Sequence, residues 1–459
     1  MTLDRDILIL GAVVVLGMLT SILDITIVNV AVPTLTTTFA TSITTVQWVM
    51  TAYMLAFASV IPLAGWATER FGAKRVWLAS LVLFMLGSVC AGLAPSIGWL
   101  IGFRVVQGLG GGMIPPVGQT ILAQAAGPER MGRVMSVIGV PMLLGPVLGP
   151  ILGGAIIGAA SWRWVFFVNL PLGAIAVLAA QRLLPDSGPR HGLRLDARGL
   201  ALLSPGIALF LYGVSQMRGL AVVAGLGLLT LFVAHSMARG KKALIDVALF
   251  RRRDFAAAAA TNFLLGVALF GALILLPLYY QLVRGAGALE TGLLLVPQGV
   301  GAALAMPVAG RLTDRIGARV VVLCGGGAAL AGTLSYTQVE TNTSYATLAV
   351  ALLVIGFGLG STIMPSMAAA FACLSREEMP RATSALNTIQ RLAGAIGTAV
   401  LALVLQRSLD GHRADAAAAF GTTFAVAAAL IVLAFVPALL LPRRRAAAAP
   451  HAAAEGGAA

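Results

Sequence analysis

Runs of roughly twenty apolar residues follow one another along almost the whole chain, with short polar turns between them. A run of this length can cross the hydrocarbon core of a bilayer as one helix. Backbone groups in lipid must hydrogen-bond internally, and the alternating pattern of a membrane barrel is absent, so the runs predict helices. We therefore expect an all-α integral membrane protein with about fourteen transmembrane helices, near residues 7–32, 46–65, 76–94, 97–118, 134–158, 164–182, 199–217, 219–237, 256–281, 291–310, 319–337, 345–370, 383–405 and 419–441.

The positions of the basic residues predict how these helices are oriented. Hydrophobic residues make up 59% of the 459 positions and charged residues only 10%, yet the net charge is +14. With the amino terminus placed in the cytoplasm, 24 of the 31 lysines and arginines fall on the cytoplasmic side and five outside. Because cytoplasmic loops carry the excess of such residues, we expect a multi-pass protein of the cytoplasmic membrane with both termini inside. The basic charge then needs no nucleic acid as a partner.

No pattern in the sequence predicts a metal or a nucleotide. The three cysteines lie in apolar spans and the four histidines in loops, tails or near a span end, so no disulfide framework or metal-ligand spacing is present. A phosphate-binding loop needs a lysine followed by Ser or Thr after a glycine-rich turn, and Lys74, Lys241 and Lys242 lack that context. We expect no cofactor and no enzymatic activity; transport would use an ion gradient or run downhill.

A short charged turn appears twice, 245 positions apart, each time after an apolar span. Two equivalent turns must face the same side of the membrane, so an even number of helices separates them. At ~30 residues per span and connection, 245 positions hold about eight helices rather than six. The surplus is the pair near 199–217 and 219–237. The repeated residues, which we expect to form matching cytoplasmic loops, are Gly65, Glu69, Arg70 and Gly72 in the first copy and Gly310, Asp314, Arg315 and Gly317 in the second.

This duplication predicts the division of the chain. Residues 1–182 are expected to form an amino-terminal six-helix half, and residues 255–441 a carboxy-terminal six-helix half. Residues 183–254 form a linker that contains the two additional helices. Residues 442–459, rich in Ala and Gly, are expected to be a disordered cytoplasmic tail.

Two charged residues are placed inside the predicted spans where lipid makes charge costly. Asp24 lies in the first span, and a carboxylate there needs a partner, a water-filled cavity or a proton. Arg104 lies in the fourth span and stays charged, so it too needs a partner. The simpler alternatives are a carboxylate that only holds helices together and an arginine that extends to the membrane surface. We favour a role for both in proton coupling.

The fifth span carries a doubled Gly-Pro pattern. Each proline removes a helix hydrogen bond, and each glycine allows a neighbouring helix to approach closely. The pattern predicts a bent and closely packed helix. Its residues are Gly145, Pro146, Gly149, Pro150, Gly153 and Gly154.

Several polar residues within the spans are candidates for a substrate cavity. Ordinary packing between membrane helices is the alternative for each, because small polar groups often bridge such helices. The fixed charge of Arg391 needs compensation, which an anionic substrate could provide. The candidates are Asn29, Gln107, Gln281, Gln298, Asn387 and Arg391, with Asn262 and Gln390 beside them and Met306, Met364, Tyr279 and Tyr280 as an adaptable apolar surface.

These motifs resemble those of the major facilitator superfamily, in its fourteen-helix drug:proton antiporter branch. The resemblance covers residues 7–441 and is carried by the turn at Gly65, by 104–112, by 145–154, and by 23–33 and 162–173. It implies two six-helix halves around a central cavity, alternating access, and Asp24 and Arg104 as coupling residues. One departure is Glu69, where the family usually has aspartate.

The function expected from this resemblance is proton-driven efflux of hydrophobic or amphipathic compounds. The expected partners are a small-molecule substrate, protons and the lipid bilayer, and nothing in the sequence implies an oligomer. Alternatives are a dedicated exporter of one endogenous metabolite, such as an antibiotic, siderophore or lipid, and an uptake symporter. A membrane sensor or assembly component that transports nothing has the least support.

Overall fold

The computed structural model describes residues 5–126, 130–186, 188, 193–340, 342–411 and 416–442. Over these residues the chain is helical, and no strand is present in them. Thirteen stretches of helix are long and apolar enough to cross a membrane, and α6 (Met131–Ala159) is a further 29-residue helix over the fifth predicted span. The all-α membrane fold is therefore confirmed. The predicted tail, 442–459, lies outside the described residues except for its first residue.

The helices fall into two groups with a pair between them in the sequence. We refer to α1–α8 as the N half and to α11–α18 as the C half. The N half consists of α1 (Arg5–Val30), α2 (Val32–Thr38), α3 (Ile43–Phe71), α4 (Ala73–Gly92), α5 (Ile97–Ala126), α6, α7 (Trp164–Phe167) and α8 (Asn169–Leu183). The linker pair is α9 (Ala197–Ser215) and α10 (Gly219–Arg239), followed by the short turns η2 (Gly240–Lys242) and η3 (Val247–Arg251).

The C half repeats the same kind of bundle. Its helices are α11 (Arg253–Leu282), α12 (Ala288–Leu294), α13 (Val296–Ile316), α14 (Ala318–Ser335), η4 (Tyr336–Gln338), α15 (Tyr345–Gly360), α16 (Ile363–Ala372), α17 (Met379–Gly411) and α18 (Ala416–Ala438).

Three predicted spans are each interrupted, and a proline follows each break. The breaks separate α7 from α8, α12 from α13 and α15 from α16. Pro171, Pro297 and Pro365 lie within the first three residues of the second helix of each pair. Proline is tolerated there because the first turn of a helix has no internal acceptor for its N–H groups. The sequence predicted these spans but not the breaks within them.

The two copies of the charged turn have the same backbone geometry. Gly72 ends α3 with φ 89°, and Gly317 ends α13 with φ 90°. The N–H of Gly72 donates to the Thr68 carbonyl at 3.0 Å, and that of Gly317 to the Thr313 carbonyl at 3.1 Å. A positive φ favours glycine because it has no Cβ. The repeated glycine is therefore required by the turn between two helices.

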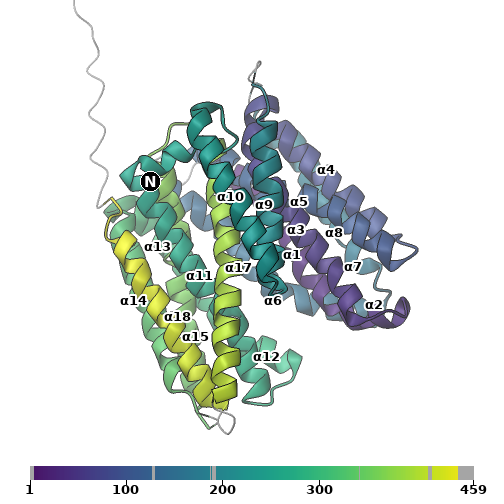
Figure 1. Ribbon diagram of the computed structural model, residues 1–459, viewed down its shortest axis with the longest axis vertical. Helices are drawn as coiled ribbons and strands as arrows, with labels where there is room; N and C mark the ends of the chain where they lie inside the picture. The colour runs from purple at the N-terminus through teal and green to yellow at the C-terminus, as the bar shows by residue number, and fades with distance from the viewer. Residues whose placement is uncertain are drawn as a thin grey trace, which may run out of the picture.

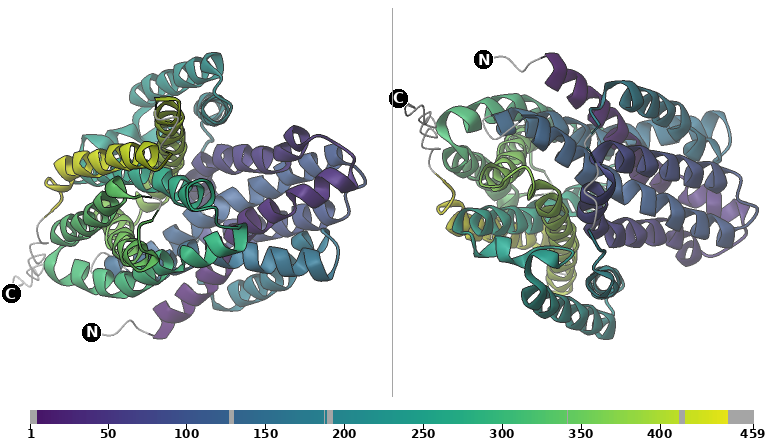
Figure 2. Two further views of the ribbon diagram at one scale, coloured as in Figure 1. Left: turned by 90° about the horizontal axis from the view of Figure 1, so that it is seen from below. Right: turned by 90° about the horizontal axis from the view of Figure 1, so that it is seen from above.

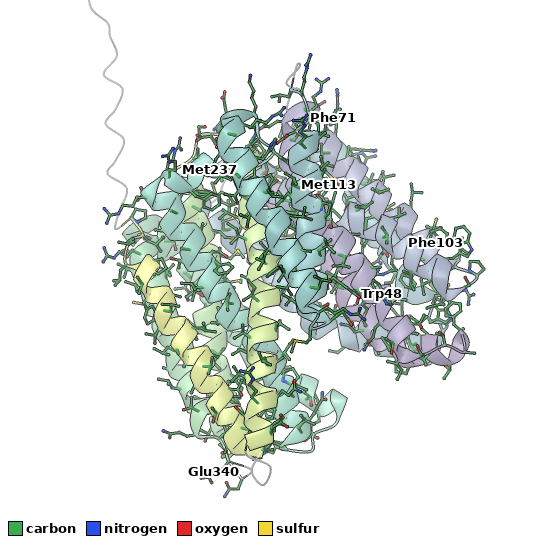
Figure 3. The ribbon with its side chains drawn as sticks, in the orientation of Figure 1. Trp48, Phe71, Phe103, Met113, Met237 and Glu340 are labelled. Carbon is green, nitrogen blue, oxygen red and sulfur yellow. The ribbon has the colours of Figure 1, made fainter. Side chains whose placement is uncertain are left out.

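Both repeated turns lie at one end of the molecule, which we call the basic end because Arg70, Arg75, Arg315 and Arg319 lie there. In Figure 3, Phe71 and Met237 mark this end and Glu340 marks the opposite end. Figure 1 shows the ribbons of the two halves close together at the basic end and spreading apart toward the opposite end. The linker pair α9 and α10 lies outside both bundles (Figure 2), with α9 packed against α3 and α17.

Candidate functional site

Asp24 and Arg104 form a hydrogen-bonded pair in the interior of the N half. Nη1 of Arg104 donates to Oδ2 of Asp24 at 2.5 Å, and both side chains are essentially inaccessible, at 1% and 0% exposure. The other carboxylate oxygen accepts from Nε2 of Gln107 and from Nδ2 of Asn169, each at 2.9 Å. The two amides share a further partner, Oγ of Ser88, at 3.1 Å. Helices α1, α4, α5 and α8 each contribute to this group, which we call the Asp24 cluster (Asp24, Ser88, Arg104, Gln107 and Asn169).

The remaining contacts of Arg104 explain how a full charge is tolerated there. Its Nε donates to the Val49 carbonyl at 3.1 Å, its Nη1 also donates to Oε1 of Gln107 at 2.7 Å, and its guanidinium lies over the Tyr53 ring at 4.0 Å. A buried charge is costly unless it is paired and hydrogen-bonded, and here both conditions are met. Arg104 therefore does not extend to the membrane surface, which excludes the simpler alternative considered for it.

The Asp24 cluster retains one buried polar atom without a partner. Oδ1 of Asn169 has no hydrogen-bond donor, although Nδ2 of the same amide is fully used. A buried acceptor left unpaired costs stability, and this oxygen has room in its bonding for a further donor. A protonated carboxyl or a water molecule would provide one.

Contacts between the halves gather at the basic end, and two of them form matching ion pairs. Nε and Nη2 of Arg381, at the start of α17, donate to the Glu69 carboxylate at 2.9–3.1 Å. Asp314, at the end of α13, accepts from the backbone N–H of Gly132 at 2.9 Å and from Nε of Arg133 at 2.8 Å, both at the start of α6. We call these the Glu69 latch and the Asp314 latch.

The difference between Glu69 and Asp314 follows from their partners. Asp314 reaches the first turn of α6, where a backbone N–H and the helix dipole favour a short carboxylate. Glu69 accepts from the guanidinium of Arg381, whereas Asp314 accepts both from a backbone N–H and from the guanidinium of Arg133. Of the other residues in the repeat, Gly65 allows α3 to approach α17, since a Cβ there would be 2.9 Å from the Pro380 carbonyl. Gly310 places its carbonyl against Gly132 in the same way, whereas Arg315 is exposed.

The glycines of α6 face α1 on the side away from the Asp24 cluster. A Cβ at Gly145 would overlap Ile22, and one at Gly149 would overlap Thr26, whose hydroxyl donates to the Gly145 carbonyl at 3.1 Å. A Cβ at Gly153 would lie 3.1 Å from the Ile27 carbonyl. Close packing is therefore confirmed for these three glycines, whereas Gly154 faces open space. The side chains of Pro146 and Pro150 lie outside the described residues.

The candidate cavity residues do not form one group. Gln107 was expected at a cavity but belongs to the Asp24 cluster, because the carboxylate there needs its amide donor. Asn29 and Gln281 are exposed, and Gln298 is mostly buried. Asn387 joins the halves through a 2.7 Å bond from its Nδ2 to Oε1 of Gln119.

Arg391 is half-buried, and its guanidinium lies 4.3 Å from the centre of the Phe57 ring of the N half. Among the other candidates, Asn262 bonds Ser366 at 3.3 Å within the C half. Nε2 of Gln390 is buried without a partner.

The apolar candidates are structural in this state. Tyr279 and Tyr280 are fully buried, and the Tyr280 hydroxyl bonds that of Tyr336 at 3.0 Å within the core of the C half. Met306 and Met364 pack against α6 at Gly139, where an added Cβ would lie 2.5 Å from Met306 and 3.0 Å from Met364. The expected adaptable surface is therefore closed by packing between α6 and the C half.

Comparison with known proteins identifies the family. The family model described as Major Facilitator Superfamily matches residues 14–398 and 299–459. The chain belongs to the major facilitator superfamily. It is 42% identical over 415 residues to the multidrug resistance protein B homolog of Mycobacterium tuberculosis, covering 88% of this chain and 77% of that protein. It is 30% identical over 417 residues to the multidrug export protein EmrB of Escherichia coli, covering 86% and 79%.

Solved structures share the fold of this facilitator. The human organic anion transporter MFSD10 aligns with a TM-score of 0.70 and 18% identity over 95% of this chain and 100% of that one. The proton:xylose symporter XylE aligns with a TM-score of 0.66 and 16% identity over 94% and 96%. The family and its relatives show a multi-pass membrane transporter of small molecules rather than an enzyme.

Two members of the facilitator's Asp24 cluster were not predicted as site residues. Asn169 lies within 162–173, one of the segments that resemble the family, but it was not named as a site residue. Ser88 lies in no such segment. Each is a polar residue inside an apolar span, which is the signal that could have found them. Their convergence on Asp24 depends on the packing of α4 and α8 against α1 and α5, and a single sequence does not contain that information.

Proposed function

We propose that this chain exports amphipathic drugs or toxic metabolites across the cytoplasmic membrane in exchange for protons, by alternating access. The observation that carries the proposal is the Asp24 cluster, in which a carboxylate with no exposed surface pairs with Arg104 and accepts from two amides. The relatives named for multidrug resistance and multidrug export support drugs as the substrate class. Proton entry would provide the energy.

The chemistry of the Asp24 cluster suits a reversible proton site. The charged carboxylate accepts from Arg104, Gln107 and Asn169. Protonation of Asp24 would remove its attraction for Arg104, whose own charge persists because guanidinium does not deprotonate in proteins. The protonated carboxyl would carry a donor, and the unpaired Oδ1 of Asn169 is an acceptor beside it. Each protonation state thus favours a different set of bonds.

Helix α1 would transmit this change to the rest of the molecule. Asp24 faces α4, α5 and α8, whereas Ile22 and Thr26, two residues to either side, face the glycines of α6. Helix α6 in turn packs against α13 and α16 of the C half. A shift of α1 on protonation would therefore move the surface on which the two halves meet.

The state described here is closed at the basic end. Both latches are formed there, and the basic residues predict that this end faces the cytoplasm. Asp24 and Arg104 lie six and seven residues from the opposite ends of their helices, or about two turns. We therefore propose that a proton reaches Asp24 from outside and leaves to the cytoplasm once the latches open.

The test is gradient-driven transport in inverted membrane vesicles that contain the full chain. An acidic lumen should drive accumulation of a fluorescent amphipathic dye by the wild type, and Asp24→Asn should abolish it. Asp6→Asn is the matched control, because Asp6 lies on the same helix and is exposed. Undiminished accumulation by Asp24→Asn would remove Asp24 from the coupling role. Depletion of dye from an acidic lumen would indicate a symporter instead.

A further inference from the structure

One face of α17 follows the boundary between the halves from the basic end inward. Arg381 binds Glu69, Ser384 lies against Gly65, and Asn387 binds Gln119. Arg391 comes next, and the spacing of three or four residues places all four side chains on the same side of the helix. Arg391 lies ten residues beyond Arg381, or about 15 Å along the helix axis. This distance is about half the ~30 Å thickness of a bilayer core.

Arg391 lies at the depth where the two halves separate. Almost every residue of α17 from 382 to 390 is buried, whereas most residues from 394 to 404 are partly exposed or exposed. On α3 the same change occurs: Phe57 is 1% exposed, and Met54, one turn further, is 38% exposed. Arg391 thus lies at the point where both α17 and α3 change from buried to partly exposed.

Arg391 differs from Arg104 of the N half and Arg381 of the boundary in having no described carboxylate partner. Arg104 is paired with Asp24 and Arg381 with Glu69, but no described carboxylate lies within ion-pair distance of Arg391. Its described contact is the Phe57 ring at 4.3 Å. That contact covers one face of the planar guanidinium, and no described residue hydrogen-bonds its N–H groups. These groups can bind carboxylate, sulfonate or phosphate in bidentate geometry.

Two further polar atoms beside this position lack partners. Nε2 of Gln390, the preceding residue, and the hydroxyl of Tyr53 are both buried and make no hydrogen bond to a described residue. The Tyr53 and Phe57 rings lie 5.8 Å apart. The two rings therefore connect the guanidinium of Arg391 with that of Arg104, which lies 4.0 Å from the centre of the Tyr53 ring.

We propose that Arg391 binds the anionic group of an amphipathic substrate between the two halves, with Phe57 holding the guanidinium in place. This inference rests on the proposed export function and adds the substrate class, an amphipath that carries a carboxylate, sulfonate or phosphate. The anion supplies the counter-charge that the protein lacks at this position. A substrate bound at Arg391 would lie beside Phe57, whose ring packs on Tyr53, and Tyr53 in turn packs on Arg104.

The proposal is tested by equilibrium binding to the purified full chain in nanodiscs of zwitterionic lipid. The probes are a fluorescein-type dye with a free carboxylate and its methyl ester, which differ in charge and hardly in shape. We expect the wild type to bind the acid at least tenfold more tightly than the ester. Arg391→Gln should weaken binding of the acid about tenfold and leave binding of the ester within a factor of two, and Arg391→Lys should fall between.

Two controls separate an anion site from a structural role. Arg407→Gln removes an exposed arginine from the same helix and should change neither affinity. Because Arg391 has no counter-ion to lose, Arg391→Gln should leave the melting temperature of the ligand-free protein unchanged or raise it. Equal weakening of both dyes, a preference for the ester, or a lowered melting temperature would overturn the proposal.

Transport measurements distinguish the failure of this inference from that of the export function. Gradient-driven export of uncharged or cationic dyes without any charge preference would overturn the substrate class and leave the export function intact. An anionic lipid headgroup has the same chemistry as the proposed substrate. If phosphatidylglycerol in the nanodiscs prevents binding of the acid and the acid is not exported, the occupant is lipid and the substrate assignment is wrong.

Discussion

At the scale of single residues, the opposite charges of Asp24 and Arg104 are buried together in the N half. Asp24 accepts three hydrogen bonds and Arg104 donates to the Asp24 carboxylate, to Gln107 and to the Val49 carbonyl, so neither charge is left uncompensated. The energetic consequence is asymmetric, because removing one partner leaves the other charge buried alone whereas removing both leaves none.

This asymmetry predicts the outcome of a double-mutant cycle. Arg104→Gln should destabilise the protein by about 3–5 kcal/mol, because it leaves the Asp24 carboxylate unpaired in the interior. Adding Asp24→Asn to that variant should restore most of the loss. Thermal unfolding of the detergent-purified proteins at neutral pH measures both effects. Additive losses in the double variant would mean that the two charges do not depend on each other.

A second residue-scale prediction concerns Asp196, which caps α9 in the linker. Burial alone would raise the pKa of the Asp196 carboxyl, but hydrogen bonds from His235 and from the backbone of Gly199 and Leu244 lower this pKa below its usual value. A depressed pKa stabilises the fold above the unfolded-state pKa of about 3.9, and this stability is lost as the pH falls through the folded-state pKa.

Asp196→Asn keeps the capping oxygen and removes the charge. It should therefore lower the melting temperature at pH 7, and the difference from the wild type should shrink steadily below about pH 4. Melting curves between pH 7 and pH 3 measure it. A difference that stays constant with pH would show that the charge of Asp196 contributes nothing and that the hydrogen bonds alone matter.

At the scale of elements, α6 and α1 form the contact on which the proposed coupling depends. Gly145 and Gly149 have no room for a side chain next to Ile22 and Thr26, whereas Gly154 of the same helix faces open space. Gly145, Gly149 and Gly154 lie within ten residues of one helix, and they differ in whether they pack against α1.

Alanine substitution should separate these glycines. Gly149→Ala forces a methyl group into Thr26, so α1 and α6 must move apart, and we expect transport to fall more than tenfold. Gly154→Ala should retain at least half of wild-type transport, since its methyl group meets no atom within 4 Å. Dye accumulation in inverted vesicles, normalised to the amount of folded protein, provides the comparison. Equal tolerance of both changes would show that this contact is not needed.

At the scale of the whole molecule, two latches of different chemistry hold the same end closed. Each joins the end of one helix to the start of a helix in the other half, and the partners are a guanidinium for Glu69 and a helix N-terminus with Arg133 for Asp314. Such contacts bias an equilibrium between closed and open states by the free energy they contribute.

Loss of one latch should therefore shift that equilibrium. Glu69→Gln is expected to raise the population open at the basic end about fivefold, which corresponds to about 1 kcal/mol. Glu290→Gln, at an exposed carboxylate near the opposite end, should have no effect. Distances between spin labels at Arg75 and Arg315, both exposed at the basic end, report the two states. An unchanged distance distribution in Glu69→Gln would contradict a latch role.

The sequence alone predicted much of this molecule, for physical reasons that also explain its limits. The bilayer acts on each segment separately, so the apolar spans, the charged turns and the need of Asp24 and Arg104 for a partner could be predicted from the sequence. The roles of Gln107 and Asn169 depend on which faces of α5 and α8 meet α1, and packing decides that. The different reach of Glu69 and Asp314 likewise became clear only with their partners in place.

The central claim, that Asp24 carries a proton in exchange for substrate, is tested most directly by proton movement in proteoliposomes of the purified chain. With no initial pH gradient, an outward gradient of an exported dye should drive protons into the wild-type liposomes, and a trapped pH indicator should record acidification. Asp24→Asn should let dye cross without any pH change. Acidification by Asp24→Asn equal to that of the wild type, at equal dye flux, would contradict the claim.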